Sequence, residues 1–202
     1  PFISGKAIFL AEVAGSHYTG PLKSDEIAPE KNLSCLIREN PETYLAQREL
    51  AIPAASLINR SPSSKGTVLR ELIESFSETQ KLALEDGAAE FLGQYAKVLI
   101  PVLIHLMVKY GISMEAHLQN AIIVFEKGLP VKLIVRDNGG IRIHKQRAAE
   151  WMDINAINDS TNLLTNDSLN LYQMFSHAVI HNHLGEMIDR KSTRLNSSHL
   201  LI

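Results

Sequence analysis

Two short apolar runs on either side of a glycine- and proline-containing segment constrain the fold of this chain most strongly. The runs are Ala121–Phe125 and Val131–Val135, and the segment between them holds Gly128 and Pro130. Both runs are rich in β-branched residues, and such a pair flanking turn residues is typical of a β-hairpin. The polar residues that flank these runs are therefore expected to meet at the open end of the hairpin.

The register of the hairpin decides which polar residues face each other. A four-residue loop, Lys127–Pro130, with symmetric pairing places Glu126 opposite Val131. On that register Asn120 faces Asp137, with Cβ atoms ~5 Å apart. Two oxygen ligands at that spacing can share a hard cation, and Mg²⁺ is typically bound by one or two protein oxygens, with phosphates and waters completing its shell. We therefore predict that Asn120 and Asp137 bind a metal.

Further polar side chains crowd around this pair. If the segment before the first strand is extended, Glu115, His117 and Gln119 project from one face. Arg136 adds a positive charge suited to an anionic ligand, and the glycine pair 139–140 lets the backbone approach a bulky group closely. Any one of these residues is more often turn or surface chemistry. Their crowding between apolar strands predicts a site for a nucleotide triphosphate and Mg²⁺, because buried polar groups need partners.

The rest of the chain predicts a mixed α+β fold. Apolar runs bounded by turn residues predict strands at Ala7–Val13 and Leu33–Arg38. Pro53 interrupts the apolar run Leu50–Ile58, which is therefore expected to be an edge strand or an irregular segment. Apolar residues at helical spacing predict helices over 68–76, 88–106 and 171–188. Pro101 should kink the second helix, and Gly111 should end it. We expect a mixed sheet, with the hairpin carrying the active-site motif, packed against long helices.

Charge and cysteine content argue against several classes of function. There are 20 Lys and Arg against 22 Asp and Glu, which leaves no positive excess for nucleic-acid binding. Cys35 is the single cysteine, which excludes an internal disulfide and fits a reducing compartment; we expect it to be buried as a small hydrophobe. The longest apolar run, Val98–Val108, is shorter than the ~20 residues of a membrane helix. We expect a cytoplasmic protein without a membrane or nucleic-acid partner.

The two ends of the chain do not look like natural termini. Residues 189–199 read D-R-K-S-T-R-L-N-S-S-H, and every codon fits the translation of a common sequencing-library adapter. We expect the natural sequence to stop near Met187 or Ile188, and residues 189–202 to have no function. Because the chain starts at Pro1, we expect residues 1–188 to be a piece of a longer protein.

At the polar residues the sequence resembles the IucA/IucC family, the aerobactin-synthetase-like group of NRPS-independent siderophore synthetases. The matching motifs are Gly111-Ile112, Glu115-Ala116-His117, Gln119-Asn120, Gly128-Leu129-Pro130 and Arg136-Asp137. Weaker agreement covers Leu36–Pro41 and Asn182-His183-Leu184. The resemblance implies that residues 1–188 are a central-to-C-terminal catalytic fragment, part of a domain of a larger synthetase.

The resemblance also implies an activity. Family members are similar to ligases that use ATP and Mg²⁺ to adenylate a carboxylate of the citrate type. A polyamine, an amino-alcohol or a hydroxamate amine then displaces AMP and forms an amide or ester. A segment that contributes to nucleotide and citrate binding in the family has no match here, so the fragment is expected to be inactive alone. The resemblance is compatible with a homodimer.

Roles for individual residues follow from the resemblance. His117 and Gln119 would contact the ATP phosphates, with His117 as the catalytic residue. Asn120 and Asp137 would hold Mg²⁺. Glu115 would support that metal site and contact ATP. Arg136 and, more weakly, Arg38 would also bind ATP. Neutralising charge on oxygen is the main chemical demand of such a reaction, and a metal and an imidazole can supply it.

Two other functions remain open from the sequence. His117-x-x-Asn120 followed by Asp137 resembles the metal-binding layout of kinase-like phosphotransferases, although the catalytic Asp near the His and the Gly-rich loop have no match.

The second alternative is a non-catalytic binding module associated with iron or a siderophore. His177, His181 and His183 lie close together, and we expect helix packing rather than metal ligation for them. FhuF-type iron reductases are related siderophore proteins with cysteine-bound clusters, and the single Cys35 argues against that chemistry.

Overall fold

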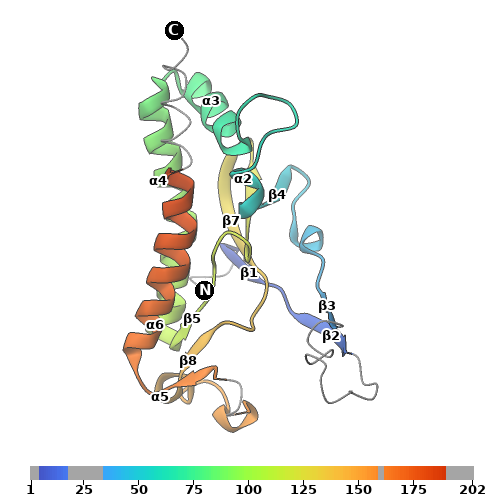
Figure 1. Cartoon of the computed structure of the whole chain (residues 1–202), viewed down its shortest axis with the longest axis vertical. Helices are drawn as coiled ribbons and strands as arrows, with labels where there is room; N and C mark the ends of the chain where they lie inside the picture. Colours follow the sequence, from blue (N-terminus) through green and yellow to red (C-terminus); the bar gives the residue numbers. More distant parts are fainter. Residues whose placement is uncertain (1–4, 18–33, 159–161, 190–202) are drawn as a thin grey trace, which may run out of the picture.

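The computed structural model describes residues 5–17, 34–158 and 162–189, and in this part the chain is a mixed α+β structure (Figure 1). Its centre is a four-stranded sheet with the strand order β1-β7-β6-β4. These strands are β1 (Ala7–Phe9), β4 (Glu49–Pro53), β6 (Ala121–Glu126) and β7 (Leu129–Val135). β1 is parallel to β7, whereas the other neighbours are antiparallel. The predicted mixed sheet and its hairpin are confirmed.

Long helices cover one face of the sheet. α4 and the last helix lie side by side along the sheet (Figure 1), joined through a side-chain contact between Tyr95 and His183. The helical segments are α2 (Ala54–Leu57), α3 (Val68–Gln80), α4 (Leu84–His105), α5 (Lys145–Ala148) and α6 (Ser168–Phe175), with 3₁₀ turns η1 (Pro41–Tyr44) and η3 (Ile154–Ala156) and π-helical segments η2 (Leu106–Tyr110) and η5 (Ser176–Gly185). Helices were predicted over 68–76, 88–106 and 171–188, and all three are confirmed. They correspond to α3, to α4 with η2, and to the last helix, which consists of α6 and η5.

Two smaller sheets extend from this centre. One is an antiparallel ribbon of β2 (Glu12–His17) and β3 (Ser34–Arg38), and the other joins β5 (Ile112–Ser113), β8 (Arg142–His144) and β9 (Leu164–Thr165). The ribbon lies away from the long helices (Figure 1). Cys35 is exposed on this ribbon, so the prediction that it is buried is wrong. The strand predicted over Ala7–Val13 is divided between β1 and β2.

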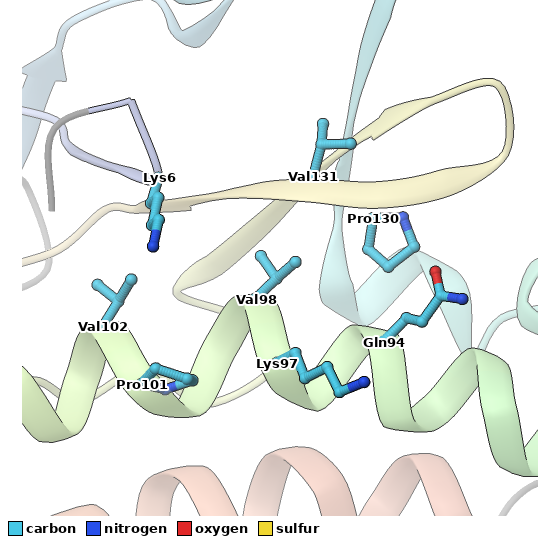
Figure 2. A pocket seen from close by; sticks show the side chains of 8 residues that line it. All are labelled: Lys6, Gln94, Lys97, Val98, Pro101, Val102, Pro130 and Val131. Atoms are coloured by element: carbon cyan, nitrogen blue, oxygen red, sulfur yellow. The ribbon is translucent and has the colours of Figure 1, made fainter. Parts of the chain in front are cut away.

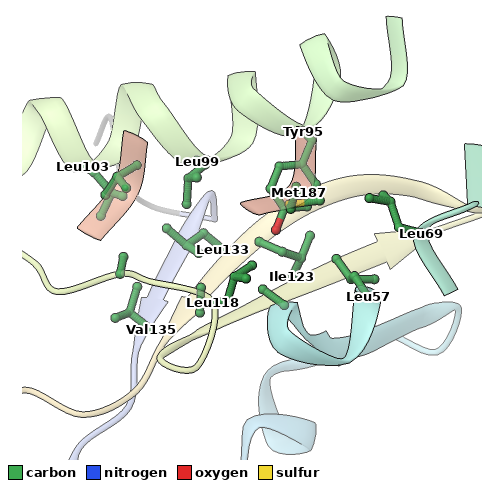
Figure 3. Packing of buried hydrophobic residues seen from close by; sticks show 14 of the residues in the cluster. Leu57, Leu69, Tyr95, Leu99, Leu103, Leu118, Ile123, Leu133, Val135 and Met187 are labelled. Atoms are coloured by element: carbon green, nitrogen blue, oxygen red, sulfur yellow. The ribbon is translucent and has the colours of Figure 1, made fainter. Parts of the chain in front are cut away.

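The core explains why β6 is apolar along nearly its whole length. Its odd-numbered residues, such as Ile123, face the helices and pack with Tyr95 and Leu99 of α4 (Figure 3). Its even-numbered residues, Ile122 and Val124, belong to a second, smaller cluster. A strand that is buried on both faces needs apolar residues at successive positions.

The helix that starts with α4 continues without interruption through η2, from Leu84 to Tyr110. By length and composition it could cross a membrane. Phe91, Tyr95 and Leu99 are fully buried in the core, so one side of this helix is apolar because it packs against the sheet and the neighbouring helices. The helix runs through Pro101 and ends at Gly111, whose φ of 69° gives the left-handed C-cap that the sequence predicts.

The β6–β7 hairpin has a tighter turn than the sequence suggested. Lys127 and Gly128 alone connect the strands, with φ values of 51° and 79°. Two successive positive φ values are typical of a type I′ turn. The register then shifts between Val124 and Phe125. The predicted four-residue loop is therefore wrong, and every pairing toward the open end moves by one residue.

Candidate nucleotide and metal site

The segment before β6 forms a turn, which we name the 115–120 turn. The backbone N–H groups of Asn120 and Ala121 donate to the carbonyl of His117, over 3.0 and 3.1 Å. The chain therefore turns from His117 onward, so the extended conformation considered from the sequence does not hold there. Exposure still alternates along the segment: Glu115, His117 and Gln119 are partly or fully exposed between buried apolar neighbours. The three polar residues are thus the accessible side chains of this segment.

Asn120 lies opposite Arg136 and not opposite Asp137. The backbone N–H of Arg136 donates a 2.9 Å hydrogen bond to the carbonyl of Asn120, which makes them the last pair of the hairpin. The expected facing of Asn120 and Asp137 is wrong because the turn is shorter and β6 and β7 pair with a register shift. The buried Asn120 donates through Nδ2 to the carbonyl of Glu115, 3.1 Å away, so its side-chain oxygen is the atom that could bind a cation.

Asp137 sits where the chain turns away from β7. Its φ of 69° is left-handed, which is uncommon for a residue other than glycine, and Oδ1 accepts the backbone N–H of Gly139 at 3.2 Å. Oδ2 lies 3.1 Å from the guanidinium of Arg38 on β3, which also contacts Glu12 at 2.9 Å. Arg38 is thus brought to the predicted metal ligand from almost a hundred residues away in sequence.

The backbone around His117 defines which nitrogen carries its proton. His117 Nδ1 accepts the N–H of Gln119 at 3.2 Å, so the neutral ring carries its proton on Nε2. This Nε2 lies 4.0 Å from Glu115 Oε1. Arg136 donates through Nε and Nη2 to the carbonyl of Gln119, at 3.1 and 2.9 Å. Arg136 therefore braces the 115–120 turn, and an N–H donor of His117 faces outward beside a carboxylate.

Glycine at 140 has a role that the sequence did not reveal. A β-carbon at Gly140 would lie 1.5 Å from Glu115 Oε2, so the backbone passes directly against that carboxylate. The prediction that the glycine pair allows a close approach is confirmed for Gly140, but the group that approaches is Glu115. Only spacing in three dimensions could have shown this contact.

The donor set suits a hard cation that is shared with phosphates. Within residues 5–17, 34–158 and 162–189, no group of three or more His, Cys, Asp or Glu could hold a metal ion by itself. Asp137 and Asn120 provide oxygens, with Glu115 nearby through the Asn120 contact. Mg²⁺ needs only one or two protein oxygens when nucleotide phosphates supply others. Asn120 and Asp137 are thus candidate ligands for a Mg²⁺ ion that is shared with nucleotide phosphates.

The histidines of the last helix do not form such a centre. His183 is fully buried and contacts Tyr95, which confirms helix packing for this residue. His177 Nε2 lies 3.1 Å from the side-chain amide of Asn182. The residues from 190 onward lie outside the described part of the chain, and so does the adapter-like segment beyond Asp189.

A groove elsewhere on the molecule is distinct from these residues. Figure 2 shows that it lies between α4 and β7. Its volume is about 490 Å³. Its lining residues are Lys6, Gln94, Lys97, Val98, Pro101, Val102, Pro130 and Val131. None of these lining residues belongs to the 115–120 turn or to the end of β7 near Asp137.

Sequence comparisons connect this geometry to known proteins. Residues 89–201 match the model of a family described as ferric iron reductase FhuF-like transporter, and residues 1–59 match the model of the IucA / IucC family. D-ornithine–citrate ligase from Staphylococcus aureus is 30% identical over 204 residues, which cover 98% of this chain and 31% of the ligase. Spermidine-citrate ligase from Bacillus anthracis is 25% identical, over 79% of this chain and 26% of the ligase.

Solved structures share the fold. Aerobactin synthetase IucC from Klebsiella pneumoniae superposes with a TM-score of 0.69 at 20% identity, covering 96% of this chain and 32% of that one. Petrobactin biosynthesis protein AsbB from Bacillus anthracis gives a TM-score of 0.69 at 22% identity, covering 91% and 30%. The chain therefore spans about a third of the length of the proteins that it matches. Both family matches lie within the segment that aligns with one relative, D-ornithine–citrate ligase, over 98% of the chain.

Proposed function

The chain belongs to the IucA/IucC family of siderophore synthetases, with residues 89–201 in the FhuF-like family, and from this premise we propose that it forms the Mg–ATP-binding part of a cytoplasmic, ATP-dependent ligase. In the proposed reaction a citrate-type carboxylate attacks the α-phosphorus of ATP and releases pyrophosphate. An amine or hydroxyl then attacks the acyl carbon and releases AMP. The names of the relatives support citrate together with D-ornithine or spermidine as the class of substrate.

One observation carries the proposal: polar residues from separate parts of the chain gather at the open end of the β6–β7 hairpin. Arg38 comes from β3, Glu115 and His117 come from the 115–120 turn, and Asp137 follows β7. The two carboxylates can bind a cation, whereas the arginine and the imidazole can donate hydrogen bonds to an anion. A triphosphate with its magnesium ion needs both kinds of group.

Each residue has a distinct task in this proposal. Asn120 and Asp137 would hold Mg²⁺ through their oxygens, with Glu115 in support, and the ion would neutralise charge on the phosphate oxygens when bound. His117 would donate from Nε2 to a phosphate oxygen. Gln119 and Arg136 would complete the phosphate contacts. Such preorganised donors stabilise the charge that develops as pyrophosphate leaves.

The ion pair between Arg38 and Asp137 suggests how the site accepts its ligand. Arg38 contacts Asp137 and also Glu12, and all three side chains are partly exposed. Exposed ion pairs contribute little stability, typically about 0–1 kcal/mol. We propose that Arg38 moves from Asp137 to a phosphate or carboxylate oxygen when the metal takes its place beside Asp137.

Iron reduction is the other function that a matched family description names. A bound iron–sulfur cluster normally uses four thiolates, and this chain contains a single cysteine. The relative that aligns over 98% of the chain, and so through both matched regions, is a citrate ligase by name. We therefore favour ligation over reduction.

The test uses the full-length protein with ATP, Mg²⁺ and citrate. A ligase releases pyrophosphate, a kinase-like enzyme releases ADP, and a binding module releases neither. Asp137→Ala should abolish pyrophosphate release and leave the circular dichroism spectrum unchanged. Glu126→Gln, an exposed change at the other end of the same hairpin, is the matched control and should keep full turnover. Unchanged turnover in Asp137→Ala would contradict the assignment, and we expect residues 1–188 alone to be inactive.

A further inference from the structure

A buried hydrogen-bonded chain connects two helices to the candidate site. The hydroxyl of Tyr95 on α4 lies 2.7 Å from His183 Nε2 in η5. His183 Nδ1 lies 2.8 Å from the carbonyl oxygen of Ala116. Tyr95 and His183 are both fully buried, and Figure 3 shows Tyr95 pointing from α4 into the core. This series of hydrogen bonds therefore ends at Ala116, the residue between Glu115 and His117.

The direction of these hydrogen bonds follows from the last acceptor. A carbonyl oxygen can only accept, so His183 must donate to Ala116 through Nδ1–H. In the neutral ring Nε2 is then the acceptor, and the Tyr95 hydroxyl donates to it. Burial lowers the pKa of His183 to about 4, with a smaller contribution from nearby His117, and raises the pKa of Tyr95. Both groups are thus neutral at pH 7, with a single arrangement of donors and acceptors.

The helix that carries His183 also has an unusual geometry. His183 lies within η5, a π-helical segment over Ser176–Gly185. π-helical turns are rare, and they often occur at functional sites. Neighbouring buried positions in η5, such as Ala178 and Val179, are apolar. A buried polar pair is costly to desolvate and specifies one geometry when every member is bonded.

We propose that Tyr95 and His183 are positioning residues that hold the 115–120 turn in its ATP-binding geometry. The proposal rests on the ligase function proposed above. The His183 contact fixes the backbone at Ala116, and Arg136 fixes it at Gln119, so the turn is held on both sides of His117. Without the His183 contact, the backbone at Ala116 would lose its hydrogen bond to the core. The side chains of Glu115 and His117 would still be present but would no longer be held in their positions.

The experiment measures hydrogen exchange in the full-length protein. His183→Leu removes both hydrogen bonds, whereas His183→Asn keeps an N–H donor near the position of Nδ1. Val179→Ala is the matched control, because it opens a cavity at a fully buried position of the same segment without removing a hydrogen bond to the turn. We expect His183→Leu to speed exchange in peptides covering 115–121 by about tenfold relative to peptides covering 122–126. His183→Asn should restore much of the protection, and Val179→Ala should leave the ratio unchanged.

A titration with Mg–ATP on the same proteins connects the turn to function. His183→Leu should weaken Mg–ATP binding by about tenfold or more, since small displacements of a positioned group are costly, and His183→Asn should weaken it less. If the unaltered protein does not bind Mg–ATP, the proposed function fails, while the exchange ratio still decides the positioning role.

Two results would overturn the positioning role itself. One is an equal exchange ratio in His183→Leu and Val179→Ala, and the other is a His183→Asn protein that behaves like His183→Leu. If His183→Leu does not fold, Tyr95→Phe takes its place, because it keeps the ring and removes only the hydroxyl. It should speed exchange in 115–121 by a smaller factor, and an unchanged ratio would then overturn the proposal.

Discussion

The backbone at Gly140 passes so close to Glu115 that a β-carbon on Gly140 would lie 1.5 Å from the carboxylate oxygen Oε2. Glu115 is the first residue of the 115–120 turn, and its Oε1 lies 4.0 Å from His117 Nε2. The position of this carboxylate is therefore limited by a glycine in a different part of the chain. A change at Gly140 can move Glu115 without removing any charge from the site.

Gly140→Ala should weaken Mg–ATP binding and pyrophosphate release in the full-length protein. The new methyl group displaces the Glu115 carboxylate, and a displacement of about 1 Å at a reacting site can cost on the order of a hundredfold in rate. Gly93→Ala is the control, because a β-carbon at this position of α4 meets no atom within 4 Å. Kinetics on both variants check this expectation. Equal activity in the two would show that Glu115 placement does not matter.

The two-residue turn of the hairpin makes a prediction about stability alone. Gly128 has a φ of 79° and open space around its β-position, so Gly128→Ala should destabilise the fold by about 1 kcal/mol through backbone strain. Lys127→Asn should stabilise it by a few tenths of a kcal/mol, since asparagine tolerates the left-handed conformation. Urea unfolding measures both changes. A destabilising Lys127→Asn would contradict the type I′ geometry.

The depressed pKa of His183 predicts how stability depends on pH. Its value of about 4 in the folded protein lies below the ordinary 6.5, so the unfolded chain binds more protons between these values. Stability from this group is fully present above pH 6.5 and is lost as the pH falls toward 4, by up to about 1.4 kcal/mol per pH unit. Urea unfolding at pH 7, 5.5 and 4.5 should show this slope. His183→Asn should reduce it, and an equal slope in both proteins would count against the assignment.

The crossing of α3 and α4 gives a prediction with a control on the same helix. A β-carbon at Gly87 would lie 2.0 Å from Ser77 Oγ and 2.8 Å from its Cβ, so Gly87→Ala should destabilise the fold by about 1–3 kcal/mol. Gly93 has open space around its β-position, so Gly93→Ala should stabilise α4 by up to about 1 kcal/mol. Thermal unfolding of both variants distinguishes them. A neutral Gly87→Ala would mean that the helices can move apart freely.

Several features of the fold could be predicted because they depend on neighbours in sequence. The alternation of turn residues with apolar runs indicates the β6–β7 hairpin, and 3.6-residue spacing indicates α3, α4 and the last helix. A glycine after Lys109 and Tyr110 marks the end of η2, because a left-handed residue there favours glycine. The family resemblance rests on local motifs over residues 111–137; it is confirmed by a family match over residues 1–59 and by a relative that aligns with 98% of the chain.

The residues of the candidate site could be predicted from the sequence, but the contacts between them could not. The register depends on Lys127, a residue that seldom adopts a positive φ, so its sequence does not reveal the two-residue turn. That single difference places Asn120 opposite Arg136. The metal, ATP and catalytic roles of these residues stay predictions until they are measured.

Sequence alone therefore determined the elements and the residue types of the candidate site, since both are written in short-range patterns. Tertiary structure alone decided that Arg38 meets Asp137, and that Tyr95 and His183 reach Ala116. These contacts join residues far apart along the chain, and helix and sheet periodicities carry no information about such distances. They arise when α4 and the last helix pack on one face of the sheet and the β2–β3 ribbon brings Arg38 to the end of β7.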